Sequence, residues 1–138
     1  MKETVSYHIM TLYRDFLAYT TEALKDLGIR FGQMPVLLWV GKHPGCSHAE
    51  LTRGLGLDWG YSQRSITKLA EDGFLRKEFD EAASCNRLTL TDQGQHVFLT
   101  CHQVFQSWDR VRTADFSAEE TETLLLLLTR LTSEKKEG

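Results

Sequence analysis

Cysteine is scarce in this chain of 138 residues, which has Cys46, Cys85 and Cys101 and no other. The three are widely separated, odd in number and without a C-x-x-C pair, so the sequence does not predict a disulfide framework. Scattered cysteines of this kind suit a reducing compartment. We therefore expect a cytoplasmic protein.

Long hydrophobic runs are also absent. The longest, Leu124 to Leu128, is five residues and lies among threonine and glutamate, whereas a membrane-spanning helix takes about 20 apolar residues. Met1 to Thr4 lack the apolar segment of a signal peptide. The sequence thus predicts neither export nor a membrane partner.

An excess of positive charge is missing as well, because 16 Lys and Arg against 19 Asp and Glu give a net charge of −3. Any DNA-binding surface therefore has to be a local basic patch. The chain has no nucleophile–base–acid set, P-loop or G-x-G-x-x-G motif. We expect no enzymatic activity and no cofactor.

The chain does contain strong helical periodicity, with 41% hydrophobic and 25% charged residues. This mix is typical of a single globular domain, here residues 1–138. Apolar residues three and four apart predict helices over 4–27 and 31–42, and Lys42-His43-Pro44-Gly45 then breaks the chain.

Capping signals delimit the next elements. The S-x-x-E box at 47–50 predicts a short helix, Gly56 a turn, and Asp58 the N-cap of a helix over 59–72. The remaining predictions are strands at 74–79 and 87–91, a helix of about 20 residues from Thr91, a last helix opened by a capping box at 117–120, and fraying over 134–138.

Two short helices joined by a glycine turn and followed by a hairpin are the order of a winged helix-turn-helix. The predicted fold class is therefore mostly α with a small β-hairpin, in the order α-α-α-α-β-β-α-α. The helix over 59–72 would enter the major groove, with Ile66 and Leu69 pointing inward. Its outward face has Trp59, Gly60, Tyr61, Arg64, Thr67 and Lys68.

Arg64 is the strongest candidate for reading DNA, because a guanidinium can bind a guanine edge or a phosphate through two hydrogen bonds. Lys68 could either neutralise a phosphate or pair with Glu71 or Asp72. Trp59 could stack on the sugar-phosphate backbone or fold back at the helix start. The candidate phosphate contacts are Lys68, Arg76, Lys77 and Arg87.

An ordered set of short pieces carries a family resemblance. They are Gln33 with the apolar run 34–40, Glu50-Leu51, Leu55-Gly56-Leu57-Asp58, Arg64, Leu69, Gly73-Phe74-Leu75 and the run from Leu88 to Gly94. In this order and spacing the chain resembles the MarR family of bacterial transcription regulators, over nearly its whole length.

The resemblance implies a homodimer formed by residues 1–30 and 92–138, with a DNA-binding lobe at 46–91. Such dimers bind a pseudo-palindromic site on double-stranded DNA, usually as repressors released by a small ligand or oxidant. The residues themselves agree with a dimer, because the terminal helices have apolar side chains that need cover, namely Phe16, Leu124, Leu125 and Leu128.

The predicted wing departs from the family. An Asp-x-Arg element with a minor-groove arginine is usual there, but this chain has Ala82-Ala83-Ser84 after Asp80-Glu81. An acidic tip without arginine does not suit the negative minor groove. Ser62 also replaces a residue that is usually apolar.

Metal and thiol sensing are alternatives. His43, Cys46 and His48 have zinc-binding side chains, but a loop or cap role is favoured, and His96 and His102 lie on different helix faces. We therefore expect no metal. Cys46, in a loop expected to be exposed, is the better candidate for a low-pKa thiol, whereas Cys101 on an apolar stripe is expected in the core.

An effector pocket for a small aromatic or apolar molecule is a further hypothesis, with core packing as the alternative. The candidate lining residues are Tyr13, Phe16, Trp39, His102 and Trp108. A rival function of another class is a winged helix that binds protein instead of DNA, which the acidic wing favours.

Overall fold

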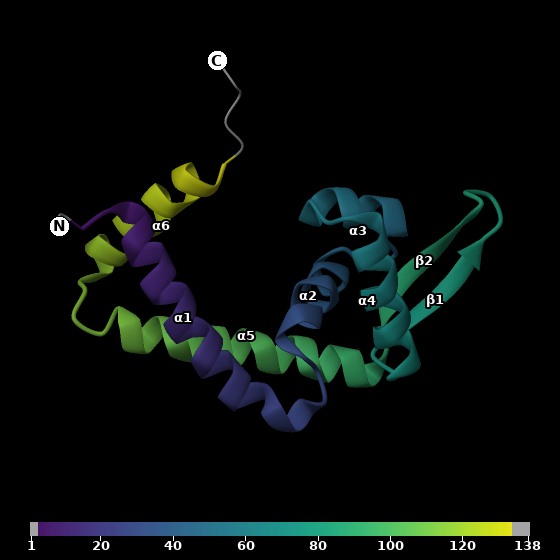
Figure 1. The fold of residues 1–138 in the computed structure, drawn as a ribbon, viewed down its shortest axis with the longest axis horizontal. Helices are drawn as coiled ribbons and strands as arrows, with labels where there is room; N and C mark the ends of the chain where they lie inside the picture. Colours follow the sequence, from purple (N-terminus) through teal and green to yellow (C-terminus); the bar gives the residue numbers. More distant parts are fainter. Residues whose placement is uncertain (1–2, 134–138) are drawn as a thin grey trace, which may run out of the picture. The chain divides into compact units, whose positions relative to one another are not determined.

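The computed structural model describes residues 3–133, which form six α-helices, two 3-10 turns and a two-stranded sheet (Figure 1). The elements follow the predicted order and confirm the winged helix-turn-helix. Their bounds are α1 Val5–Leu24, η1 Lys25–Leu27, η2 Phe31–Gln33, α2 Met34–Lys42, α3 His48–Leu55, α4 Trp59–Glu71, β1 Leu75–Asp80, β2 Cys85–Leu90, α5 Asp92–Arg112 and α6 Ala118–Thr132. The predicted fraying over 134–138 lies outside the described residues.

The chain divides into two compact units, residues 1–105 and 106–138. In the first unit, α2 supplies the centre of the core through Val36, Leu37 and Val40, which are fully buried. Every other element of the winged helix-turn-helix adds to this core, with Leu51, Leu69, Leu88, Val97 and Cys101.

Local signals set the helix boundaries as the sequence predicts. The Asp58 side chain accepts the Tyr61 N–H at 3.2 Å and opens α4. Gly56 ends α3 with φ of 64°, in the left-handed region that glycine adopts without steric cost. Caps and turns of this kind depend on a few neighbouring residues, so the sequence alone locates them.

Only half of the first predicted capping box forms. The Ser47 hydroxyl accepts the Glu50 N–H at 3.1 Å, but the Glu50 carboxylate lies 3.4 Å from the Arg87 guanidinium. The second box is complete, because the Ser117 N–H donates to Glu120 and the Glu120 N–H donates to Ser117.

The hairpin is antiparallel, with its register running from Leu75 opposite Leu90 to Asp80 opposite Cys85. Strand β2 begins two residues earlier than predicted. On its other side it pairs with Cys46, through hydrogen bonds of 2.8 Å from Gly45 N to Leu88 O and from Leu88 N to Cys46 O. The segment after α2 therefore forms an isolated β-bridge with β2, which connects the wing to the core.

Apolar side chains are exposed on α1 and α6. On α1 these include Val5, Ile9 and Met10, each at least half exposed. On α6 they include Leu125, Leu126, Leu127 and Leu131. Exposed apolar surface of this extent on a folded chain is typical of an interaction site.

Candidate DNA-binding surface

Helix α4 is sharply two-sided. Ser62, Ile66 and Leu69 are buried, whereas Trp59, Tyr61, Arg64 and Lys68 are exposed. The buried side follows the 3.6-residue period, so the predicted inward and outward faces are those observed. The structure thus exposes Arg64 and Lys68 on the side away from the core, with Trp59 stacked on His48 and Tyr61 bonded to Gly32.

The Arg64 side chain folds back toward the start of α4. A Cβ added at Gly60 would lie 3.2 Å from both Arg64 Nη1 and Asp58 Oδ2. The guanidinium therefore lies over the first turn of the helix, the part that reaches base edges in helix-turn-helix complexes. Lys68, farther along, is 3.2 Å from Asp72, an exposed pair that contributes little stability.

A cleft runs along α4 beside the α1–α2 linker, with a volume of about 400 Å³. We call it the basic cleft, and its lining residues are Arg30, Gly32, Gln33, Tyr61, Arg64, Ser65 and Lys68. Tyr61 Oη closes one part of it by donating to the Gly32 carbonyl at 2.9 Å. Sequence reasoning missed Arg30, because no local pattern connects a linker residue with a helix about thirty positions away.

A polar joint at Ser62 connects α3 to α4. The buried Ser62 hydroxyl lies 2.9 Å from His48 Nε2 and 2.7 Å from Thr52 Oγ1, and it donates to the Trp59 carbonyl at 3.0 Å. The Trp59 ring stacks on His48 with centroids 3.5 Å apart. Trp59 thus folds back at the helix start, while half of its surface remains exposed.

The environment of His48 in this joint disfavours the protonated imidazolium form. Burial, followed by the nearby Lys77, lowers the pKa of His48 below its ordinary value. The neutral ring is therefore favoured near pH 7, which suits its stacking on the Trp59 indole.

The wing tip is organised by Asp80. Its Oδ1 accepts the N–H groups of Ala82 and Ala83 at 3.0 and 3.3 Å, and its Oδ2 lies 3.3 Å from Arg87 Nε. The Ala83 N–H and the Arg87 guanidinium hold the pKa of the Asp80 carboxyl below its usual range. Asp80 is thus the residue that shapes the turn, and the early start of β2 follows from this closure.

The candidate phosphate contacts of the hairpin do not share one face. Arg76 and Lys77 are consecutive in β1 and so point to opposite sides of the sheet. Lys77 is on the side of His48, whose pKa it lowers. Arg87 is engaged with Asp80, Glu50 and the Gly45 carbonyl, so much of its charge is compensated within the protein.

Comparison with known proteins shows which proteins this chain is similar to. No family model matches the chain. It is 33% identical over 137 residues to the HTH-type transcriptional regulator BilQ of Clostridium symbiosum (strain WAL-14163), covering 99% of this chain and 95% of that protein. It is 27% identical over 124 residues to BilQ of Clostridioides difficile (strain CD3), covering 89% and 84%.

Solved structures agree in fold. A MarR protein from Peptoclostridium difficile DA00132 has a TM-score of 0.84 at 22% identity, over 96% of this chain and 87% of that one. The transcriptional regulator SlyA has a TM-score of 0.83 at 22% identity, over 94% and 92%. The chain belongs to the MarR family of HTH-type transcriptional regulators.

As a MarR-family protein, the chain is a DNA-binding regulator of transcription and not an enzyme. This confirms the predicted fold and functional class. None of the helices in residues 3–133 is long and apolar enough to cross a membrane. The individual DNA-contacting residues stay predictions.

Cys46, the candidate for a low-pKa thiol, does not lie in an exposed loop. Its side chain is 4% exposed, because the segment that looked like a loop pairs with Leu88 and lies against the core. Burial raises the pKa of Cys46 to about 11. Cys101 is fully buried, as predicted, and burial also raises its pKa to about 11.

We predict that Cys85, which is partly exposed, reacts with a thiol reagent at neutral pH well before Cys46 and Cys101. The thiolate is the reactive form, and burial keeps both core thiols protonated until the pH approaches about 11. Timed alkylation followed by peptide mass spectrometry measures the three rates. In denaturant the rates should converge, whereas rapid labelling of Cys46 in the folded protein would contradict its burial.

The histidines near Cys46 have other partners. His48 belongs to the polar joint, and His43 Nδ1 lies 3.0 Å from the Trp39 carbonyl while its ring stacks on Trp39. Across residues 3–133 there is no group of three or more His, Cys, Asp or Glu side chains placed to hold a metal ion. The structure therefore gives the metal-sensor hypothesis no site within that part of the chain.

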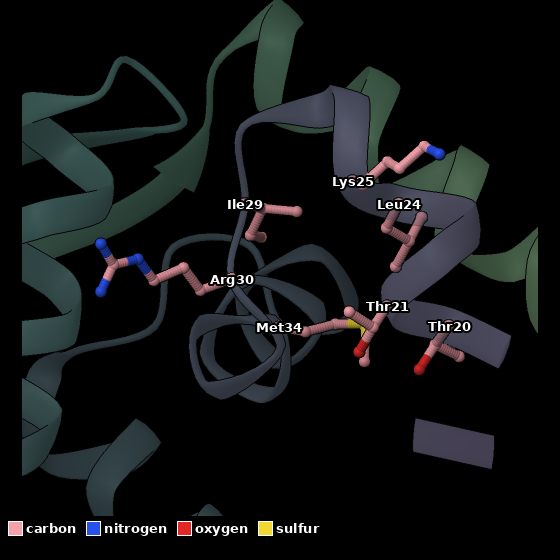
Figure 2. A pocket seen from close by; sticks show the side chains of 7 residues that line it. All are labelled: Thr20, Thr21, Leu24, Lys25, Ile29, Arg30 and Met34. Atoms are coloured by element: carbon pink, nitrogen blue, oxygen red, sulfur yellow. The ribbon is translucent and has the colours of Figure 1, made fainter. Parts of the chain in front are cut away.

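An apolar cavity of about 290 Å³ lies at the end of α1 (Figure 2). Leu24, Ile29 and Met34 supply its apolar wall, with Thr20, Thr21, Lys25 and Arg30 around them. None of the five predicted effector residues lines this cavity. Phe16 packs edge-on against Phe105, and the His102 ring lies between Phe98 and Phe105.

The other three predicted effector residues lie elsewhere. Trp39 stacks on His43 and packs against Gly54, where an added Cβ would overlap its indole. Tyr13 is an exposed residue of α1. Trp108 belongs to the second unit, where the Arg112 guanidinium lies 5.8 Å from its ring. Whether these side chains bind an effector stays a prediction.

Proposed function

We propose that this MarR-family regulator is a homodimeric repressor that occupies a pseudo-palindromic operator, and that a small apolar or aromatic effector releases it. The observation that carries the proposal is the exposed side of α4, where Arg64 and Lys68 lie beside Arg30 in the basic cleft. The whole chain has a net charge of −3. A local gathering of cations on an acidic chain is the footprint expected of a DNA-binding surface.

The proposed roles follow from position. Arg64 reads a base from the first turns of α4, where Trp59, Gly60 and Tyr61 approach the same groove. Lys68 and Lys77 neutralise phosphates. Arg76 and Arg87 have weaker support, since Arg76 points to the other side of the hairpin and Arg87 is already engaged with two carboxylates.

The dimer is proposed from the exposed apolar faces of α1 and α6, which belong to the segments 1–30 and 92–138. Burying these faces against a second copy would remove apolar surface from water. Each Å² of apolar surface buried would stabilise the dimer by roughly 25 cal/mol. A two-fold dimer then places two copies of α4 for a pseudo-palindromic site, leaving residues 46–91 as the DNA-binding lobe.

The effector site is proposed to be the cavity at the end of α1. Its volume of about 290 Å³ and its wall of Leu24, Ile29 and Met34 suit a small apolar molecule. It lies directly against the linker that leads into α2, so an occupant can change how that linker supports the DNA-binding lobe.

The test combines two measurements. Sites selected from genomic DNA should contain a pseudo-palindrome, and sedimentation at micromolar concentration should give twice the chain mass of 15.8 kDa. DNA retention should also fall steeply with salt. A monomer, or retention that salt does not affect, would overturn the proposal and favour a protein-binding winged helix.

Adding an arginine to the wing tip is expected to tighten DNA binding. The variant is Glu81→Gln with Ala83→Arg, and it keeps Asp80 because Asp80 closes the turn. Losing a carboxylate reduces repulsion by phosphate, and a guanidinium can enter a narrow minor groove. The slope of log affinity against log salt should steepen by about one for each phosphate newly neutralised.

The matched control for the wing is Glu81→Gln with Ala83→Gln, which removes the same acid without adding a cation. Fluorescence anisotropy over a salt series measures both variants. Equal slopes for the two would mean that the tip does not approach DNA, and α4 would then carry the contact alone.

A further inference from the structure

Arg30 is a cation outside every helix-turn-helix element, and hydrogen bonds to Gln33 hold its backbone. Its N–H donates to Gln33 Oε1 at 3.2 Å, and its carbonyl accepts the Gln33 N–H at 2.9 Å. Gln33 is buried, and so is Ile29 on the other side of Arg30. The backbone that holds this exposed side chain is therefore fixed on both sides.

The linker that contains Arg30 is also tied to α4. Tyr61 Oη donates to the Gly32 carbonyl at 2.9 Å, which connects a residue of the first turns of α4 to the linker. An added Cβ at Gly32 would lie 3.3 Å from the same Tyr61 oxygen, so the two segments are in close contact. When α4 lies on a ligand, Arg30 therefore lies close to the same ligand.

The side chain of Arg30 leaves the apolar cavity and joins the basic cleft. In Figure 2 its guanidinium points away from Thr20, Thr21 and Leu24, and Arg30 lines the cleft together with Arg64 and Lys68. None of the residues that line the cleft is acidic. Lys68 is paired with Asp72 outside the lining, so the Arg30 and Arg64 guanidinium groups are the cations of the cleft that are best placed to bind an anion.

We propose that Arg30 binds a phosphate of the DNA backbone next to the groove that α4 enters, which extends the contact beyond the helix-turn-helix and the wing. The inference rests on the proposed function, since it requires α4 to lie on DNA. A fixed backbone reduces the entropy lost when the arginine is ordered on its phosphate. The contact is to phosphate, so it adds affinity without sequence preference.

The experiment compares wild-type protein with Arg30→Gln, using fluorescence anisotropy on a selected operator duplex and on an unrelated duplex over a salt series. Arg30→Gln should weaken both complexes by a similar factor, about three- to tenfold at moderate salt, and reduce the salt slope by about one. Arg30→Lys should restore most of the slope, because it keeps the charge. Lys42→Gln, an exposed charge at the other end of α2, should behave as wild type.

Failure of the Arg30 contact and failure of the proposed function give different results. If wild-type protein binds with a steep salt slope and Arg30→Gln keeps that slope, the Arg30 contact is overturned and the proposed function stands. A loss confined to the operator duplex would also overturn it, because it would indicate base reading. If wild-type protein binds neither duplex, the proposed function itself fails. Thermal melting confirms that the variants are folded.

Discussion

Replacing Arg64 with alanine is expected to weaken operator binding by about 1–3 kcal/mol per half-site if the guanidinium holds a guanine edge bidentately. The physical reason is its place over the first turn of α4, where an added Cβ at Gly60 would lie 3.2 Å from its Nη1. Because a base contact carries sequence information, the preference at one position of each half-site should relax. Competition binding with duplexes that differ at single base pairs measures both effects.

Two further variants separate the possible roles of Arg64. Arg64→Lys keeps the charge but loses the planar fork, so it should lose the base preference and retain the salt slope. Lys42→Ala removes one charge at the end of α2 and should change neither. Unchanged preference in folded Arg64→Ala would remove this residue from the reading surface.

Replacing Gly94 with alanine is expected to destabilise the fold by about 1–3 kcal/mol or more, as overpacking of a filled site does. An added Cβ would overlap the Phe74 carbonyl oxygen and lie 3.4 Å from the Leu90 Cβ. That carbonyl cannot rotate away, because it accepts the Thr91 N–H at 3.1 Å. Denaturant unfolding measures the loss.

Gly60→Ala is the matched control for Gly94→Ala. Its added Cβ would lie 3.2 Å from Arg64 Nη1, the end of a long flexible side chain, and 3.2 Å from Asp58 Oδ2, a carboxylate oxygen that can shift slightly while it keeps its bond to the Tyr61 N–H. Alanine also favours a helix over glycine by about 1 kcal/mol. Stability should therefore be kept or raised. Equal stability of Gly94→Ala and wild type would show that Phe74 and α5 are not in the close contact described.

Much of the fold could be predicted because its signals are local. The Asp58 cap and the Gly56 turn are set by residues within one helical turn, and the burial of Ile66 and Leu69 follows from their spacing. The hairpin strands were displaced by one or two residues, since the side chain of Asp80 decides where the turn closes.

What escaped prediction depends on contacts between distant segments. Cys46 follows Pro44 and Gly45, which is the pattern of an exposed loop, yet an isolated β-bridge to Leu88 holds it buried against the core. Arg30 has no local motif, and its meeting with α4 depends on the packing of the linker. In the same way, a serine at position 62 suggests a packing defect until His48 and Thr52 are seen as its partners.

The polar joint at Ser62 determines how α4 is rotated about its own axis as well as how deeply it packs against the core. Dispersion contacts between aliphatic side chains have no preferred direction, so helices joined only by them can slip by small amounts at low cost. A hydrogen bond weakens steeply as its donor–hydrogen–acceptor angle departs from linear. The Ser62 hydroxyl has three hydrogen-bonding partners around it. Turning α4 about its own axis would break these bonds while Ser62 remains buried, which is costly. These hydrogen bonds therefore fix the rotation of α4 about its axis. Substitutions on its exposed side can change which bases are read without changing the orientation of the helix.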